Sequence, residues 1–545
     1  MALAHLLLLP FVLPSLEALS NSSTFLSHEG NHTMQAMIQQ VCVDMADPES
    51  CFSNFRREYE LLGLKSPAAV LSAAIKASIV EANQAMNVVN KFANSPTTPL
   101  EKIAIQDCME LLDMSVYELS CSLGKTEKMI DVCYDSSLHA WLSAALGNQD
   151  TCLEGFDGTD GRISDCIKGS IYQVTQLISN VLVLYHKMLH GFPMSETPVY
   201  DPEDEGSSDD FPPWMTGQDR DLLMAGPNGE HVDVIVAQDG SGNFTSIMEA
   251  VNQAPDYSPT RYTIYVKEGV YEEIVDLNKK KQNILLMGQQ MDTTVISGNR
   301  SVVQGWTTFR SATFAVTGQG FIAMFITFRN TAGAENHQAV ALRVDSDKSA
   351  FYNCSIEGYQ DTLYSHSLRQ FFRRCRIFGT VDYIFGNGQA VFQNCFIETN
   401  RPLPQQQVTI TAHGRTNWTQ STGFSLQDCR VEATYPAYLG RPWKKYSRTV
   451  FMGTYLSDMV QPEGWLEWNG NFALSTLYYG EYENGGPGWL PERRIRWPGF
   501  HLIPNNDVRT VYFFSVDFFI DGLSWLPATG IEFTTFRSIF KPYPT

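Results

Sequence analysis

The chain has 545 residues, which is too long for one ordinary hydrophobic core, so we expect at least two domains. A hydrophobic content of 43% excludes a chain that is disordered throughout. The net charge of -20 is unevenly distributed, because 31 acidic and 12 basic residues precede Val232, whereas 28 acidic and 27 basic residues stand from Val232 onward. The acidity therefore belongs to the N-terminal part, and the C-terminal part carries no bulk charge against an acidic substrate.

Residues 1–20 have the pattern of a secretory signal peptide. An apolar run from Leu3 to Leu13 is too short to span a membrane and is followed by small residues near Ala18. An N-terminal core helix is the alternative, because no Lys or Arg stands near the start. No later stretch is apolar enough to cross a bilayer. A secretory route also suits the Asn-x-Ser/Thr triplets, which begin at Asn21, Asn31, Asn243, Asn299, Asn353 and Asn417.

Residues 30–192 are expected to form an all-α four-helix bundle. Apolar residues recur there at helical spacing, and Pro99 stands where a helix would begin. The periodic segments are Ala68–Ala93, Leu100–Leu123, Leu138–Ala145 and Ile163–Leu189. Long helices with short connections favour an up-and-down bundle. Residues 193–231 follow as an acidic, proline-containing linker.

Residues 232–541 contain short apolar runs separated by Gly, Asn and Asp, which indicates strands and turns without long helices. The pattern F-x-x-C-x-I begins at Phe351, Phe372 and Phe392, so the repeat is 21 and then 20 residues long. Looser copies begin at Phe321 and Leu426. This period predicts a parallel β-helix in which each repeat is one coil. A leucine-rich repeat fits less well, because its Leu and Asn framework is absent.

Two aspartates are separated by the same interval as the repeat. Asp361 and Asp382 are 21 residues apart, so we expect them to stack on adjacent coils, about 4.8 Å apart. Gln338 and Gln360 are 22 residues apart and should stack beside them. Two carboxyl groups this close cannot both ionise cheaply, so one should have a raised pKa and keep its proton. The ionised carboxylate can then attack, the protonated one can donate, and two amides can hold an oxyanion.

The spacing alone leaves other interpretations open. An Asn and Asp ladder on a solvated face of a solenoid has the same pattern. A pair of carboxyl groups also serves glycosidases. The repeat therefore predicts acid–base chemistry without identifying a substrate.

Five short motifs follow one another in the C-terminal part. They are Gly269–Glu273 (GVYEE), Gln338–Arg343 (QAVALR), Gly358–Leu363 (GYQDTL), Asp382–Asn387 (DYIFGN) and Leu439–Trp443 (LGRPW). Together they make the chain resemble plant pectin methylesterases. The resemblance implies an all-β, right-handed parallel β-helix of the pectin lyase-like kind. It also implies an aspartyl esterase that hydrolyses methyl esters of galacturonate units in pectin, with release of methanol and with neither a metal ion nor an organic cofactor.

By this resemblance, Asp382 is the nucleophile that attacks the methyl ester. Asp361 would protonate the departing methanol and then activate a water molecule. Gln360, together with Gln338, would stabilise the tetrahedral oxyanion. Arg441 would pair with Asp382, orienting it and keeping it ionised.

The resemblance also implies substrate contacts. Trp443 would give the sugar an apolar platform, and Thr308 lies at the family's remaining substrate-contact position. The expected partner is methyl-esterified pectin (homogalacturonan), with pectin methylesterase inhibitor proteins as further partners. Neither nucleic acid nor, after signal removal, a membrane is expected. The chain is expected to be a secreted monomer of the cell wall.

The helical part resembles the inhibitor-like pro-region of this family, and we expect it to be autoinhibitory. The chain has 11 cysteines without a CxxC pair, which fits disulfides better than a zinc site. Cys42 and Cys51 are close enough for a hairpin bridge, and the family implies a second bridge between Cys108 and Cys152. The cysteines left over in this part are Cys121, Cys133 and Cys166.

In the catalytic part the resemblance implies a disulfide between Cys375 and Cys395, which would join adjacent coils. A bridge between Cys395 and Cys429 is a competing assignment. The stacked cysteines are equally compatible with unpaired thiols that fill the core. The sequence leaves the state of Cys354 undecided.

Four departures from the family pattern stand near its motifs. The processing site is usually a dibasic sequence followed by two leucines, but Arg220–Leu223 reads RDLL, which puts release of the pro-region in doubt. Tyr383 replaces the common Phe, Gly388–Gln389 replaces a small apolar pair, and His413 replaces Gln. We expect the last three to border the cleft and to alter its subsites.

Cleavage of the pectin chain and binding without catalysis are two alternative functions. A polygalacturonase would need additional Asp clusters, and a pectate lyase would need an acidic calcium-binding set with a basic residue, and neither pattern is found. A catalytically silent pectin-binding or inhibitor-like protein is the second alternative. Intact Gln338, Gln360, Asp361, Asp382 and Arg441 argue against it.

Overall fold

The computed structural model describes residues 66–95, 97–129, 132–191 and 232–536. The described residues belong to one compact unit that begins at Lys65. Several predicted features lie outside them: the signal peptide, Asn21, Asn31, the Cys42 and Cys51 pair, and the Arg220–Leu223 sequence. None of the described helices is long and apolar enough to cross a bilayer.

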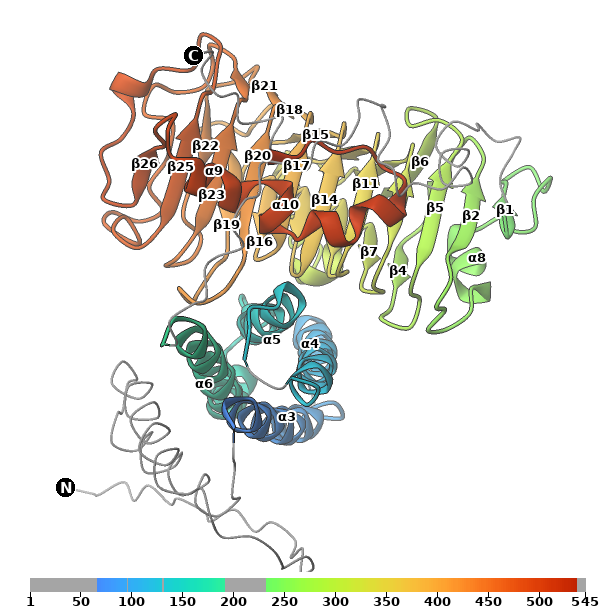
Figure 1. Ribbon diagram of the computed structural model, residues 1–545. Helices are drawn as coiled ribbons and strands as arrows, with labels where there is room; N and C mark the ends of the chain where they lie inside the picture. Colours follow the sequence, from blue (N-terminus) through green and yellow to red (C-terminus); the bar gives the residue numbers. More distant parts are fainter. Residues whose placement is uncertain (1–65, 96, 130–131, 192–231, 537–545) are drawn as a thin grey trace, which may run out of the picture. The chain divides into compact units, whose positions relative to one another are not determined.

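The described residues from 66 to 191 form a helical bundle, as predicted. Its helices are α3 (Pro67–Asn90), α4 (Pro99–Thr126), α5 (Ser136–Glu154) and α6 (Arg162–Gly191). Each helix packs against two others, and Figure 1 shows them nearly end-on around a common core. Helix α4 begins with a capping box: Glu101 N–H donates to the Thr98 hydroxyl, and Thr98 N–H donates to the Glu101 carboxylate.

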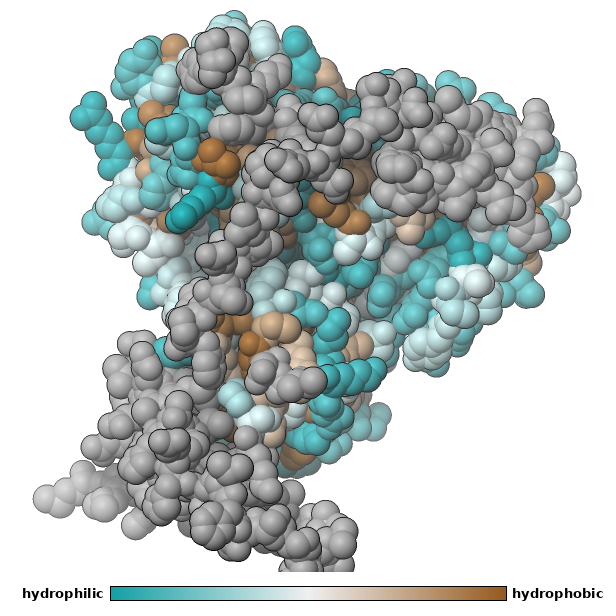
Figure 2. Space-filling view, in the orientation of Figure 1, coloured by the Kyte–Doolittle hydropathy of each residue, from teal (hydrophilic) through white to brown (hydrophobic). Residues whose placement is uncertain are grey.

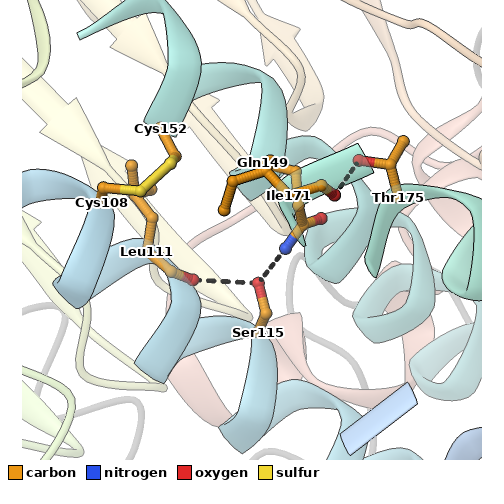
Figure 3. Close-up of a disulfide and its surroundings, with 7 residues drawn as sticks. All are labelled: Cys108, Leu111, Ser115, Gln149, Cys152, Ile171 and Thr175. Carbon is orange, nitrogen blue, oxygen red and sulfur yellow. Dashed lines mark hydrogen bonds between the residues drawn. A yellow bond between two sulfur atoms is a disulfide. The ribbon is translucent and has the colours of Figure 1, made fainter. Parts of the chain in front are cut away.

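A disulfide between Cys108 and Cys152 joins α4 to α5, as the resemblance implied. Figure 3 shows this bridge beside a small polar network. The Ser115 hydroxyl donates to the carbonyl of Leu111 and accepts from the side-chain amide of Gln149, both at 2.9 Å. The covalent bridge and the buried hydrogen bonds fix the register between the two helices.

From residue 232 the chain forms three parallel sheets, which together make the predicted parallel β-helix. In spatial order, sheet A contains β1 (Val234–Val236), β2 (Tyr262–Val266), β5 (Ile284–Gly288), β8 (Ile322–Met324), β11 (Ser349–Tyr352), β14 (Arg369–Arg373), β17 (Gln389–Gln393), β20 (Gly423–Gln427), β23 (Arg448–Met452), β25 (Tyr478–Tyr482) and β26 (Phe500–Leu502). Sheet B contains β3 (Gly269–Glu272), β6 (Thr294–Gly298), β9 (Thr327–Asn330), β12 (Ser355–Glu357), β15 (Arg376–Gly379), β18 (Phe396–Thr399), β21 (Arg430–Glu432) and β24 (Tyr455–Leu456). Sheet C contains β4 (Val275–Leu277), β7 (Phe314–Val316), β10 (Leu342–Val344), β13 (Leu363–Ser365), β16 (Ile384–Gly386), β19 (Val408–His413) and β22 (Ala437–Gly440).

The F-x-x-C-x-I repeats stand at equivalent positions in successive coils of this solenoid. Phe351, Phe372 and Phe392 pair in sheet A, and their rings stack at 4.8 and 4.7 Å between centroids. The later copy at Leu426 pairs in the same register. The looser copy that begins at Phe321 is two residues out of register with the later copies, because Ala323 is the residue that pairs with Phe351. In that coil the sequence pattern is inverted, with a small residue in sheet A and Phe328 in sheet B opposite Ile356.

The predicted disulfide between Cys375 and Cys395 is wrong, because both residues are free thiols, as are Cys354 and Cys429. Each of the four is buried in the core. Each sulfur donates to a main-chain carbonyl of the preceding coil: Cys375 Sγ lies 3.4 Å from the Phe351 oxygen, and Cys395 Sγ lies 3.5 Å from the Phe372 oxygen. The thiols therefore act as small core residues, each with a weak hydrogen bond of its own.

Short helices complete the fold. They are α8 (Ile247–Gln253), α9 (Val508–Phe514) and α10 (Val516–Phe519), with one-turn helices at Phe309–Ser311, Ala334–Asn336, Pro491–Arg493, Gly522–Ser524 and Leu526–Thr529. Figure 1 shows α9 and α10 running across the strands of sheet A. Phe514 and Phe519 pack there on the outer face of the sheet, against Phe371 and Val391. On the described surface visible in Figure 2, hydrophobic side chains occur in small groups among hydrophilic ones.

Candidate active site

The two aspartates predicted from the repeat occupy matching positions in adjacent coils. Asp361 stands two residues before Leu363 and Asp382 two residues before Ile384, and these two hydrophobic residues pair between β13 and β16. The Asp361 N–H donates to the carbonyl of Val381 at 3.0 Å. Both aspartates have left-handed backbone, with φ of 60° and 51°. The turn before each strand therefore presents its carboxyl group at the same place in the coil.

The predicted catalytic and substrate-binding residues all line one cavity of about 370 Å³. They are Thr308, Gln338, Gln360, Asp361, Asp382, Arg441 and Trp443. Gln338 and Gln360 pair directly as a parallel bridge between neighbouring coils, as the sequence spacing predicted. The sequence thus identified a set of residues that the fold brings together, although they span more than a hundred positions of the chain.

Asp382 is held by three side-chain hydrogen bonds. Arg441 binds it with both arms of the guanidinium, Nε to Oδ1 at 2.8 Å and Nη2 to Oδ2 at 2.6 Å. The hydroxyl of Thr409 donates to Oδ1 at 2.6 Å. Bidentate pairing with Arg is the strongest and most directional way to hold a carboxylate. The carboxylate of Asp382 is therefore fixed in orientation at the wall of the cavity.

Asp361 lies in a different electrostatic environment. Burial, followed by the negative charge of Asp382, holds the pKa of the Asp361 carboxyl well above its usual range, while the charge of Arg441 opposes this in part. The expected division between a protonated and an ionised carboxyl thus has its physical cause in burial and in like-charge repulsion. The direction of this shift favours the protonated form of Asp361.

Aromatic rings line the remainder of the cavity. The rings of Trp443 and Phe385 are 5.9 Å apart, and Phe385 stacks on Tyr364 at 4.1 Å. Trp443 lies directly over Gly414, where an added Cβ would come within 2.8 Å of the indole ring. Trp468, which is 39% exposed, packs against the Arg441 guanidinium at 4.4 Å. Such rings offer flat apolar surfaces to the faces of sugar rings.

Comparison with known proteins agrees with this geometry. Residues 233–523 match the family model described as Pectinesterase, and residues 36–184 match the model described as Plant invertase/pectin methylesterase inhibitor. The chain belongs to the pectinesterase family.

Proteins whose names pair a pectinesterase with a pectinesterase inhibitor match most of this chain. This pectinesterase is 50% identical over 546 residues to pectinesterase/pectinesterase inhibitor 22 of Arabidopsis thaliana, covering 97% of this chain and 98% of that protein. It is 48% identical over 486 residues to a pectinesterase/pectinesterase inhibitor of Prunus persica, covering 86% and 90%. Among solved structures, the pectin methylesterase from carrot is 50% identical, with a TM-score of 0.55, and the match covers 56% of this chain and 98% of that one.

The sequence of this pectinesterase did not indicate that Thr409 and Trp468 belong to the site. Thr409 lies one coil beyond Asp382, but that coil is 27 residues long, so the period of 20 or 21 residues did not align the two. The pairing of Ile384 with Thr411 restores the register and places Thr409 beside Asp382. A signal was present in the β-strand sequence VTITAH, whose alternate threonines face the same side.

Three departures from the family pattern were expected to border the cleft, and this expectation is wrong. Tyr383 is fully buried in the core of the solenoid, and Gln389 bonds to the main chain of Phe519 and to Ser421. His413 is also buried, and burial lowers the pKa of its imidazole to about 3. The residues that line the cavity of this pectinesterase include none of these.

The helical part of the pectinesterase lines the same cavity. Leu100 of α4, Thr151 and Glu154 of α5, and the following Gly155 and Asp157 contribute to its wall. Glu154 forms an ion pair with Lys444, the residue next to Trp443. Further pairs run the same way, with the acid on the helices and the base on the β-helix: Lys279–Asp113, Arg310–Asp107, Arg310–Glu110 and Arg343–Glu110. The acidic excess of the N-terminal part thus supplies partners for basic residues around the site.

Proposed function

We propose that this pectinesterase hydrolyses the methyl esters of galacturonate units in pectin, with Asp382 as nucleophile and Asp361 as proton donor. The observation that carries the proposal is the unequal carboxyl pair. Asp382 is fixed by Arg441 through two hydrogen bonds, whereas burial and the charge of Asp382 raise the pKa of Asp361. One group is suited to attack and the other to donate a proton.

In the first half-reaction, a carboxylate oxygen of Asp382 adds to the ester carbon, and the carbonyl oxygen becomes an oxyanion. The side-chain amides of Gln338 and Gln360, both at the cavity wall, would donate to this oxyanion. The tetrahedral intermediate collapses as the bond to the methoxy oxygen breaks. Asp361 gives its proton to that oxygen, methanol leaves, and an acyl anhydride with Asp382 remains.

In the second half-reaction, Asp361 is a carboxylate and can take a proton from water. The hydroxide adds to the substrate's acyl carbon, and the bond to Asp382 breaks. The product forms as galacturonic acid and gives its proton to solvent as it leaves as a carboxylate, so that Asp382 is again ionised and Asp361 is again protonated. The two residues thereby return to the protonation states from which they began, so no other reactant is needed.

The polymer would lie along the aromatic side of the cavity. Trp443 and Trp468 line it, and Thr308 adds a hydroxyl beside them. Flat rings suit the apolar faces of sugars, and the guanidinium of Arg441 would favour the de-esterified carboxylate as it forms. These features favour methyl-esterified homogalacturonan as the substrate.

The helical part would keep the site closed. Its residues line the catalytic cavity, and its ion pairs link it to the β-helix at Lys279, Arg310 and Lys444. A polymer chain and the helices would then compete for the same surface. We propose that the helical part is autoinhibitory, and that the enzyme acts in the cell wall after secretion directed by residues 1–20.

Two products distinguish this function from polymer cleavage. Protein cut within residues 193–231 and freed of its helices should release methanol from methyl-esterified pectin without forming new reducing ends. The variant Asp382→Asn, shown to be folded by circular dichroism, should release none. New reducing ends without methanol would identify a depolymerase instead. If protein cut within residues 193–231 and freed of its helices forms neither product, a silent pectin-binding protein is favoured.

A further inference from the structure

Thr409 is a buried residue of β19 whose side chain contacts Asp382 in two ways. Its hydroxyl donates to Asp382 Oδ1 at 2.6 Å, and the main-chain N–H of Asp382 donates to the same hydroxyl at 3.0 Å. A main-chain N–H can only donate, so the hydroxyl accepts there and its single proton must go to the carboxylate. The direction of both bonds is thus determined by chemistry.

The main chain of Thr409 is also held in place. Its N–H donates to the carbonyl of Thr380 at 3.1 Å, and its carbonyl accepts from the N–H of Tyr383 at 3.4 Å. The side chain is fully buried, so no bulk water competes for the carboxylate on this side. Asp382 itself has a left-handed backbone with φ of 51°, a conformation that costs energy for a residue with a Cβ. The bond from its N–H to Thr409 helps to offset that cost.

The two oxygens of Asp382 are consequently unequal. Oδ1 accepts from both Thr409 Oγ1 and Arg441 Nε, whereas among the described residues Oδ2 accepts only from Arg441 Nη2. A carboxylate oxygen has about two lone pairs available for hydrogen bonding, so Oδ1 is saturated and Oδ2 retains one. We infer that Thr409 is a positioning residue that leaves Oδ2 as the attacking oxygen of Asp382. This inference rests on the function proposed above.

The same contact has a consequence after the attack. Once Oδ2 is bonded to the acyl carbon, Oδ1 becomes the carbonyl oxygen of the anhydride, and Thr409 still donates to it. A donor on that carbonyl draws electrons from the anhydride and makes the Asp382 carboxylate a better leaving group. Thr409 therefore acts on both half-reactions through Asp382, without touching the substrate, and its loss should lower kcat much more than it changes KM.

Thr411 provides a matched control on the same strand and face. It is also buried, and its hydroxyl donates to the carbonyl of Leu439 at 2.8 Å rather than to a catalytic group. Thr409→Val and Thr411→Val each remove one buried hydroxyl from β19 with little change in volume. Both should lose thermal stability to a similar extent, but only Thr409→Val should lose activity.

The test measures methanol release and thermal unfolding for protein cut within residues 193–231 and freed of its helices. Thr409→Val should lower kcat about 10²-fold, as the loss of one well-placed donor does elsewhere, with KM changed less than about threefold. Thr409→Ser, which keeps the hydroxyl, should recover most of kcat, and Thr409→Cys, a weak donor, should fall between them.

Some outcomes would overturn the inference. Wild-type kcat in Thr409→Val would do so, as would equal losses of kcat in Thr409→Val and Thr411→Val. If Thr409→Val does not fold, the Ser and Cys variants decide, because equal activity in these two contradicts the role of the hydroxyl. Asp382→Asn is measured alongside. If it remains active the proposed function itself fails, whereas if it is inactive and Thr409→Val is fully active only the inference about Thr409 fails.

Discussion

Asp361 and Asp382 hold the same position in successive coils of the β-helix, yet their surroundings are opposite. Asp382 receives both arms of Arg441, at 2.6 and 2.8 Å. Within the described part of the chain Asp361 forms no such pair with a cation; burial and the charge of the neighbouring Asp382 raise its pKa, which the more remote charge of Arg441 opposes in part. One repeated backbone position therefore yields two chemically different carboxyl groups, because the guanidinium hydrogen-bonds to only one of the two.

The raised pKa of Asp361 has a consequence for stability. A carboxyl whose pKa is raised by folding stabilises the folded state only below its unfolded pKa, and this contribution is lost as pH rises through the folded value. Asp361→Asn removes the penalty, so we expect a higher Tm than that of wild type at neutral pH. The difference should disappear as pH falls below about 3, where the carboxyl is protonated in both states. Thermal unfolding followed by circular dichroism across pH measures this.

Asp382→Asn serves as the contrasting variant. It should lower Tm at neutral pH, because it leaves the partly buried guanidinium of Arg441 without its carboxylate. A lower Tm for Asp361→Asn than for wild type at neutral pH would contradict the assignment of the raised pKa. In activity, the same pKa should appear as a decline in methanol release when pH rises far enough to deprotonate Asp361.

Trp468 should contribute to binding of the polymer rather than to the chemical steps. It lines the cavity and is 39% exposed, while nearby Phe472 is 40% exposed but does not line it. Trp468→Ala should raise KM for pectin several-fold, in proportion to a lost stacking contact of about 1 kcal/mol, with a smaller effect on kcat. Phe472→Ala is the control and should leave both constants near wild type. Equal effects of the two changes would remove the case for a sugar platform.

The ion pair between Glu154 and Lys444 should help to hold the helices over the site. Glu154→Gln should increase methanol release by the uncut chain, because one attraction across the contact is lost. Added salt should act in the same direction by screening the other pairs. Glu127→Gln is the matched control: it breaks an ion pair with Lys76 inside the bundle, 2.7 Å long, and should leave activity unchanged. If neither Glu154→Gln nor added salt increases methanol release by the uncut chain, ion pairs do not hold the helices over the site.

The four core cysteines should remain thiols. Peptide mapping of the unreduced protein should recover Cys108 joined to Cys152, whereas Cys354, Cys375, Cys395 and Cys429 should react with an alkylating reagent only after denaturation. Burial keeps the reagent away from the folded core. Recovery of a peptide that joins Cys375 to Cys395 would contradict the arrangement found here and restore the pairing implied by the family.

The repeat predicted the core of the site because equal spacing in a solenoid means equal position. Asp361 and Asp382 share an interval with the Phe and Ile ladders around them, so their stacking follows from sequence alone. The prediction failed where a coil changed length. Thr409 lies 27 residues after Asp382, and only the strand pairing of β16 with β19 relates the two positions.

Other features depend on contacts that no periodicity records. The resemblance to a family assigned Arg441 to Asp382, but neither spacing nor composition indicates that Glu154 of a distant helix meets Lys444. Sequence comparison also overstated the importance of His413, Tyr383 and Gln389. Tyr383 fills the solenoid core, His413 is buried with its imidazole bonded to the Gly388 carbonyl, and Gln389 bonds to Phe519 and Ser421 outside that core.

The central claim is that two carboxyl groups with different protonation states carry the ester hydrolysis. It is tested most directly by initial rates of methanol release from methyl-esterified pectin for wild type, Asp361→Asn and Asp382→Asn, each confirmed as folded, cut within residues 193–231 and freed of its helices. We predict that each variant loses at least about 10³-fold in kcat, because neither a proton donor nor a nucleophile can be replaced by an amide. Wild-type rates in either variant would contradict the account.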